Sequence, residues 1–67
     1  MLKFMDFAVY CLEEYRNEKN MSGKDAFKLF FEKKVFDYIE NNFDYLHLFG
    51  GDVICGELDS YLQNAPA

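Results

Sequence analysis

Apolar and polar residues follow one another along the chain with the spacing of amphipathic helices. With successive residues placed about 100° apart, the segment 2–18 separates a broad apolar face from a face of charged and amide side chains. Phe7 and Tyr10 are exceptions, because both fall on the polar side. The pattern therefore predicts a first helix at 2–18 with two aromatic side chains outside its buried face. The residues expected to be buried are Leu2, Phe4, Met5, Ala8, Val9, Cys11, Leu12 and Tyr15.

A polar turn separates this segment from the next one. The stretch 20–23 interrupts the apolar pattern, and Ser22 followed by Asp25 three residues later is typical of a helix N-cap. We expect a second helix at 23–33, with Phe31 at the edge of its buried face. That buried face comprises Ala26, Phe27, Leu29 and Phe30.

The longest predicted helix, 35–49, carries two stripes. One stripe is apolar and is expected to face the core, and the other is formed by Tyr38, Tyr45 and Phe49. Gly50-Gly51 after this segment is typical of a helix that ends on a left-handed glycine. The core stripe comprises Val35, Phe36, Ile39, Phe43 and Leu46.

A fourth helix is predicted at 52–63, with Asp52 as its N-cap. Gly56 lowers the helix propensity, so the stretch 53–55 could instead be extended. Its inward residues are expected to be Ile54, Leu58, Tyr61 and Leu62. The four segments together predict an all-α fold, a compact four-helix array with short loops in a single domain over 1–67.

The composition indicates a folded chain with a small core. Of the 67 residues, 51% are apolar and 19% are aromatic, which is far from the composition of disordered proteins. A chain of this size buries only about 60% of its unfolded surface, so we expect a dense core or oligomerisation to contribute to stability. Cys11 and Cys55 are expected to be buried thiols in a reducing cytoplasm. Asp6 interrupts the apolar run 4–12, which predicts neither a signal peptide nor a membrane span.

Charge is distributed unevenly along the chain, whose net charge is -5. Residues 1–34 hold all seven Lys and Arg with six acidic residues, whereas residues 35–67 hold six acidic residues and no Lys or Arg. Such a C-terminal half repels phosphate groups, so nucleic acid and anionic membranes are poor partners and a basic protein surface is a good one. The acidic residues, which could also be only the solvated faces of two helices, are Asp37, Glu40, Asp44, Asp52, Glu57 and Asp59.

Few side chains could support chemistry. Asp44 and His47 lie one helical turn apart, so the acid could orient the imidazole or both could bind a metal ion, but the sequence fixes no further ligand. The simpler interpretation is that His47 lies near a helix end and bonds free carbonyl groups. Cys11, Cys55 and His47 lack the paired spacing of a zinc site, and neither a catalytic triad nor a phosphate-binding loop is recognisable. We therefore expect no enzymatic activity, no cofactor and no metal.

The aromatic residues outside the buried faces could be the rim of a small core or part of a protein interface, where Tyr and Phe are enriched. We place a basic protein partner at the aromatic stripe of the third helix, because only that stripe lies in the acidic half. The alternative is a homodimer with Phe7, Tyr10 and Phe31 at its interface. The candidate partner-binding residues are Phe7, Tyr10, Tyr38, Asp44, Tyr45, His47 and Phe49.

Several short motifs, in order along the chain, resemble a family of short bacterial proteins known only as a domain of unknown function. The family pattern has Phe-x-x-x-Cys-Leu/Ile, Leu/Met-Ser-Gly-Lys/Glu, Asp-Tyr-Ile, Asp-x-Leu-His and a glycine before a last helix. Here the matching stretches are 7–12, 21–25, 37–39, 44–47 and Gly50 or Gly51, while Leu48 and the stretch 53–56 depart from the pattern. Members of that family are often encoded beside proteins similar to ADP-ribosyltransferases. The resemblance therefore implies an antitoxin-like regulator of such a partner.

Overall fold

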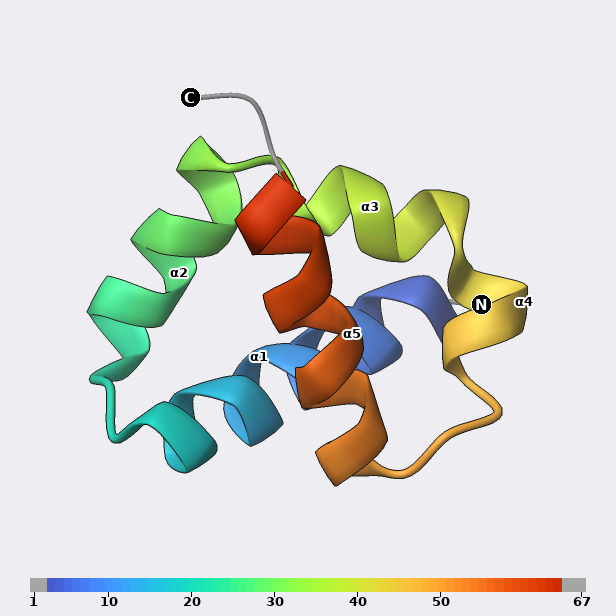
Figure 1. The fold of residues 1–67 in the computed structure, drawn as a ribbon, viewed down its shortest axis with the longest axis horizontal. Helices are drawn as coiled ribbons and strands as arrows, with labels where there is room; N and C mark the ends of the chain where they lie inside the picture. Colours follow the sequence, from blue (N-terminus) through green and yellow to red (C-terminus); the bar gives the residue numbers. More distant parts are fainter. Residues whose placement is uncertain (1–2, 65–67) are drawn as a thin grey trace.

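The structure, a computed structural model, describes residues 3–64 and consists of five helices joined by short connections (Figure 1). The helices are α1 (Lys3–Lys19), α2 (Gly23–Glu32), α3 (Val35–Asn41), α4 (Phe43–Leu46) and α5 (Gly51–Asn64). No strand occurs among the described residues, so the predicted all-α fold is confirmed.

The first helix is the element on which most of the others pack. α1 contacts α2, α3 and α5, and Figure 1 shows α5 crossing in front of α1 with α4 at the right edge of the molecule. Burying one face of each helix against α1 encloses a single apolar core. The core residues are Cys11, Tyr15, Phe30, Val35, Ile39, Leu46, Ile54, Cys55 and Leu58.

The turns between the first three helices follow from local hydrogen bonds and two left-handed residues. The predicted N-cap is confirmed, because Ser22 Oγ accepts a hydrogen bond of 3.0 Å from the backbone N–H of Asp25. Asn20 and Lys34 have φ values of 56° and 58°, which allow the chain to turn sharply after α1 and after α2. The second of these turns directs α3 back across α1.

The predicted single helix at 35–49 is wrong, since the chain breaks at Asn42 into α3 and the single turn α4. Asn42 lies outside the helical region, at φ -119° and ψ 23°, and its side-chain Nδ2 donates to the Tyr38 carbonyl oxygen at 2.9 Å. Asn side chains bond nearby backbone groups in this way and so compete with regular helix hydrogen bonds. The break rotates α4 relative to α3, and residues 47–50 form a loop.

The predicted left-handed glycine after this segment is also wrong, because no glycine in the described part of the chain has a positive φ. The Gly50 carbonyl oxygen instead accepts from the Ile54 N–H at 3.0 Å, so Gly50 precedes α5 and Gly51 is its first residue. Asp52 lies in the first turn, where its Oδ1 accepts from the Val53 N–H at 2.9 Å. The stretch 53–55 is helical, which decides the alternative that the sequence left open.

Three residues that the periodicity assigned to the buried faces are exposed. Met5, Val9 and Phe27 keep 54%, 54% and 53% of their surface accessible. All three line one hollow between α1, α2 and α3 that no other described element covers. Leu2, which was also expected to be buried, lies outside the described residues. Between residues 3 and 64, no helix combines the length and apolar character that crossing a membrane requires.

Candidate protein-interaction surface

α4 presents a group of side chains at one edge of the molecule (Figure 1). Its Leu46 is fully buried and fixes the turn on the core, whereas Asp44, Tyr45, His47 and Leu48 are exposed. A single helical turn held by one buried leucine projects its other side chains in several directions. The break at Asn42 is therefore what separates these side chains from the rest of the predicted third helix.

A first row of rings connects α1 with α4. Phe7 stacks on Tyr10 at 6.2 Å between ring centroids and meets Phe43 edge to face at 5.3 Å. Phe43 in turn stacks on the His47 ring at 5.0 Å. Such aromatic pairs contribute beyond their buried area. Phe7 therefore packs α4 against α1, whereas Tyr10 stacks on Phe7 within α1 and stays exposed.

A second row of rings runs along the side where α3 and α4 meet α5. Tyr38 stacks on Tyr61 of α5 at 4.5 Å, and Tyr45 meets Phe49 edge to face at 4.9 Å. The Tyr45 hydroxyl donates to a Glu57 carboxylate oxygen at 3.5 Å. Partial burial raises the pKa of Tyr38, and the charges of Glu57 and Tyr45 raise it further.

We call this second row, together with the neighbouring carboxylate of α4, the acidic aromatic surface. Tyr45 and Asp44 are its exposed members, while the others are partly buried and hold it in place. Its residues are Tyr38, Asp44, Tyr45, Phe49 and Glu57.

One of the six C-terminal carboxylates already has a partner within the chain. Asp59 accepts from the Lys19 ammonium and from the Tyr15 hydroxyl, both at 2.8 Å. The bond from Lys19 holds the pKa of Asp59 below its usual value, while burial raises the pKa of Tyr15 to about 12. Asp59 therefore ties α5 to α1 and is not free to bind another protein.

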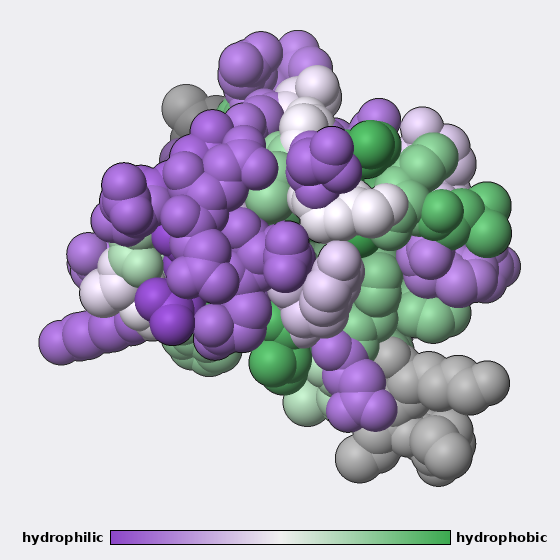
Figure 2. Space-filling model, turned by 90° about the horizontal axis from the view of Figure 1, so that it is seen from below, coloured by the Kyte–Doolittle hydropathy of each residue, from purple (hydrophilic) through white to green (hydrophobic). Residues whose placement is uncertain are grey.

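The remaining acidic positions are available at the surface. Asp37, Glu40, Asp44 and Asp52 are exposed and Glu57 is partly exposed. The ion pairs found within residues 3–64 join Glu13 to Arg16 and Asp59 to Lys19, so neither involves these five carboxylates. The surface of α3, α4 and the start of α5 is consequently rich in uncompensated negative charge. In Figure 2 hydrophilic side chains cover the side of the α1–α2 connection, and more of the apolar surface lies toward α4.

His47 has the structural role that the simpler interpretation predicts. Its Nδ1 lies 2.9 Å from the Phe43 carbonyl oxygen, and the ring nitrogen must be the donor because a carbonyl oxygen can only accept. The structure shows no hydrogen bond or ion pair between His47 and Asp44. Among the residues that the structure describes, no three His, Cys, Asp or Glu side chains converge on a possible metal position.

The two thiols are buried as predicted. Burial, and a hydrogen bond from Cys55 to Glu18, raise the pKa values of Cys11 and Cys55 to about 12. Because the thiolate is the reactive form, these two side chains are inert at neutral pH.

The structure divides the predicted site residues between the two rows of rings. Phe7, Tyr10 and His47 belong to the first row, and Tyr38, Tyr45 and Phe49 belong to the second, with Asp44 between them on α4. Sequence reasoning missed two contributors, Phe43 and Tyr61, because it assigned both to the core, whereas for Glu57 it left open a docking face or a solvated face. Contacts between α5 and the segment 38–45 join positions distant in sequence, so periodicity carries no signal for them.

Comparison with protein families gives one result. The model of the family described as "Protein of unknown function (DUF3791)" matches residues 6–65. Comparison with curated proteins and comparison with solved structures each gave no significant match.

Proposed function

This chain belongs to the family of proteins of unknown function DUF3791, and we propose that it is a non-enzymatic protein-interaction module. In this proposal the acidic aromatic surface binds a basic surface of another protein. The tyrosine rings supply apolar contact area and the carboxylates supply charge complementarity, the combination found where interfaces are both tight and selective.

The observation that supports the proposal is the position of the uncompensated charge. Solvated helix faces usually carry both signs, but the segment after Lys34 has no Lys or Arg at all. Within this segment Tyr45 is half exposed, follows Asp44 directly and is held by Glu57 and Phe49. A ring that is already oriented loses little conformational entropy when a partner covers it. Tyr45 is therefore the expected centre of the contact.

We further propose that the partner is a protein similar to ADP-ribosyltransferases and that this chain acts as its antitoxin-like regulator in the bacterial cytoplasm. This part of the proposal rests on the family resemblance of the motifs from Phe7 to Gly51. It also rests on the position of genes for family members beside genes for such proteins. A small acidic regulator that covers a basic surface of a larger enzyme would block access to that surface without any chemistry of its own.

The test is to measure, by calorimetry, the binding of this chain to an ADP-ribosyltransferase-like protein encoded beside it. We expect a stoichiometric complex whose affinity falls as salt rises, since the contact is charged. Tyr45→Ala and Asp44→Lys should each raise the Kd by about tenfold or more. Glu32→Lys, an exposed charge reversal on α2, is the matched control and should leave the Kd almost unchanged. The absence of a complex, or equal effects of all three substitutions, would contradict the proposal.

A further inference from the structure

A second exposed surface, which we call the apolar groove, lies between α1, α2 and α3 and takes no part in the proposed function. Met5 and Val9 form its wall on α1, and Phe27 and Phe31 form its wall on α2. The two phenylalanine rings stack at 6.4 Å between centroids with an angle of 13° between their planes. Both walls therefore stand out from the surface. The groove residues are Phe4, Met5, Ala8, Val9, Leu12, Phe27, Phe31 and Phe36.

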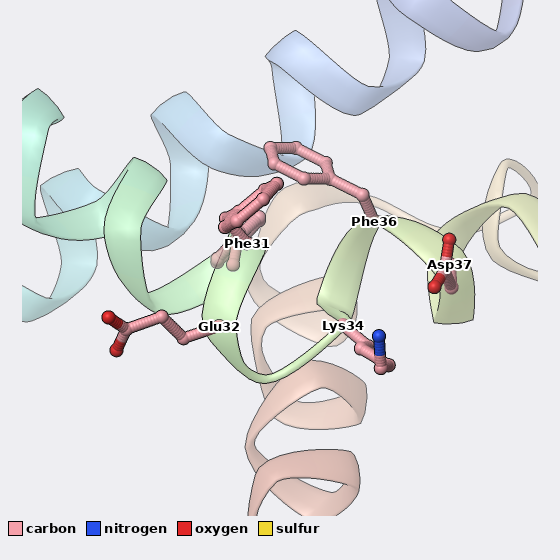
Figure 3. A pocket seen from close by; sticks show the side chains of 6 residues that line it. Phe31, Glu32, Lys34, Phe36 and Asp37 are labelled. Carbon is pink, nitrogen blue, oxygen red and sulfur yellow. The ribbon is translucent and has the colours of Figure 1, made fainter.

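The apolar surface continues from the groove to the connection between α2 and α3. Phe31 and Phe36 also line a hollow at this connection, and Figure 3 shows their rings on the same side of it while Glu32 points away. Phe36 packs against Phe27 at 5.6 Å and Phe30 at 5.4 Å, so it is held rigidly. A continuous exposed apolar face of this kind marks an interaction site in a folded protein.

The two rims of the groove carry opposite charge. Beyond the wall on α2, helical spacing places Lys24 and Lys28, which are exposed and one turn apart. Beyond the wall on α1 the same spacing places Asp6 and Glu13, also exposed. Glu13 accepts from Arg16 at 3.0 Å, so Asp6 is the acidic group of that rim without a bond to another residue of 4–64. A ligand in the groove therefore meets positive charge on one side and negative charge on the other.

We propose that a second copy of this chain covers the groove, related to the first by a two-fold axis that runs along the groove. This axis places α1 of each copy over α2 of the other, so the acidic rim of one copy lies over the lysine rim of the other. A two-fold axis across the groove would instead place lysine rim against lysine rim. Only the arrangement with the axis along the groove therefore brings rims of opposite charge together.

The size of the molecule supports the same occupant. A standard interface buries about 800 Å² on each partner, roughly a sixth of this chain's accessible surface of 4648 Å². One face that includes both groove walls and their rims can supply such an area. A domain this small also has little core of its own, so burial of four exposed apolar side chains by a second copy adds substantially to its stability.

This interface differs from the homodimer that the sequence suggested. Phe7 packs with Tyr10 and with Phe43 of α4, whereas Phe31 packs with Phe27 on the side of the groove. The three residues therefore do not form one contact surface, and of the three the groove includes Phe31 alone.

Sedimentation equilibrium of the whole chain, from micromolar to sub-millimolar concentration, tests the proposal. We expect a reversible dimer. Phe31→Glu, at a side chain that is 70% exposed, should give a monomer whose circular dichroism is unchanged. Leu48→Glu, at a 73% exposed side chain next to α4, is the matched control and should leave the dimer intact. Val9→Glu repeats the test on the other wall in case Phe31→Glu affects folding.

Charge reversal tests the arrangement of the two copies. Lys28→Glu should weaken dimerisation by about tenfold, because the lysine rim meets the acidic rim twice in each symmetric dimer. Adding Asp6→Lys to Lys28→Glu should restore most of the affinity. A wild-type protein that stays monomeric overturns the proposal, whatever else binds the groove. A dimer that Leu48→Glu disrupts while Phe31→Glu and Val9→Glu do not also overturns it. Because Leu48 borders the acidic aromatic surface and Phe31 does not, failure here is distinguishable from failure of the proposed function.

Discussion

The effect of substituting Gly51 on the free energy of unfolding should depend directly on how closely α5 packs against α1. A Cβ atom at this position would lie 2.7 Å from Cδ of Glu14, closer than carbon atoms approach, and 3.1 Å from Cγ, so the Glu14 side chain would have to move. Gly56, in the same helix, has nothing within 4 Å of an added Cβ atom. The same substitution at the two positions should therefore change stability in opposite directions.

The magnitudes follow from helix propensity and from the position of the Glu14 carboxylate. Gly56→Ala should stabilise by about 1 kcal/mol, the propensity difference between the two residues. Gly51→Ala forces the Glu14 side chain away from the N-terminus of α5, where a negative charge is worth about 0.3–1 kcal/mol, and disturbs its packing. We expect a net destabilisation of about 1 kcal/mol, which in a domain of this size lowers Tm by about 4–8 °C.

Urea unfolding followed by circular dichroism measures both changes. In a Glu14→Ala background the obstacle is removed, so Gly51→Ala should no longer destabilise, and the cycle should show a coupling of about 1 kcal/mol. If Gly51→Ala and Gly56→Ala stabilise equally, or if the effect of Gly51→Ala persists without the Glu14 side chain, the close approach of α1 to α5 is refuted.

Three further predictions concern the turns and the thiols. Ser22→Ala removes the acceptor of the Asp25 N–H and should destabilise by about 1 kcal/mol in urea unfolding. Lys34→Gly relieves a left-handed conformation at φ 58° and should stabilise by about 0.5–1 kcal/mol in the same assay, whereas an unchanged midpoint would contradict the strain. Cys11 and Cys55 have pKa values raised from 9.0 to about 12, so the unfolded chain loses protons first and stability should fall as pH rises from about 9 toward 12. Denaturation at a series of alkaline pH values should show that the free energy of unfolding of Cys55→Ala declines less with pH than that of the wild-type chain.

Local rules and periodicity account for the parts of the fold that could be predicted. The N-cap at Ser22 depends on residues within one turn, and the helices other than 35–49 depend on repeated apolar spacing, so both are visible in the sequence. The break at Asn42 depends on one side chain that bonds the Tyr38 carbonyl oxygen. The hydrophobic periodicity does not reveal this break, because the apolar residues on both sides of Asn42 keep the spacing of one continuous helix.

The candidate surface could be predicted only in part, for a related reason. Tyr38, Tyr45 and Phe49 were grouped because they shared a stripe, but in the structure Tyr38 stacks on Tyr61 while Tyr45 meets Phe49, so the stripe divides into two pairs. What holds them is α5, through Glu57 and Tyr61, and such tertiary contacts are not encoded in local spacing.

The opposite error arose at the groove. Three of its four wall residues, Met5, Val9 and Phe27, were expected to be buried because they are apolar and in phase with core residues such as Ala8. Phase places a side chain on a face but does not show whether another element covers that face. The five short helices bury the core residues but leave the walls of the groove exposed.

The most direct test of the central claim is a map of backbone amide shifts when the isotope-labelled chain is titrated with the ADP-ribosyltransferase-like protein. The account predicts that the amides with changed shifts cluster in 38–48 and around Glu57, while the shifts of the α2 amides do not change. Perturbations centred on α2, or none at saturating partner, would contradict the assignment of the acidic aromatic surface as the binding site.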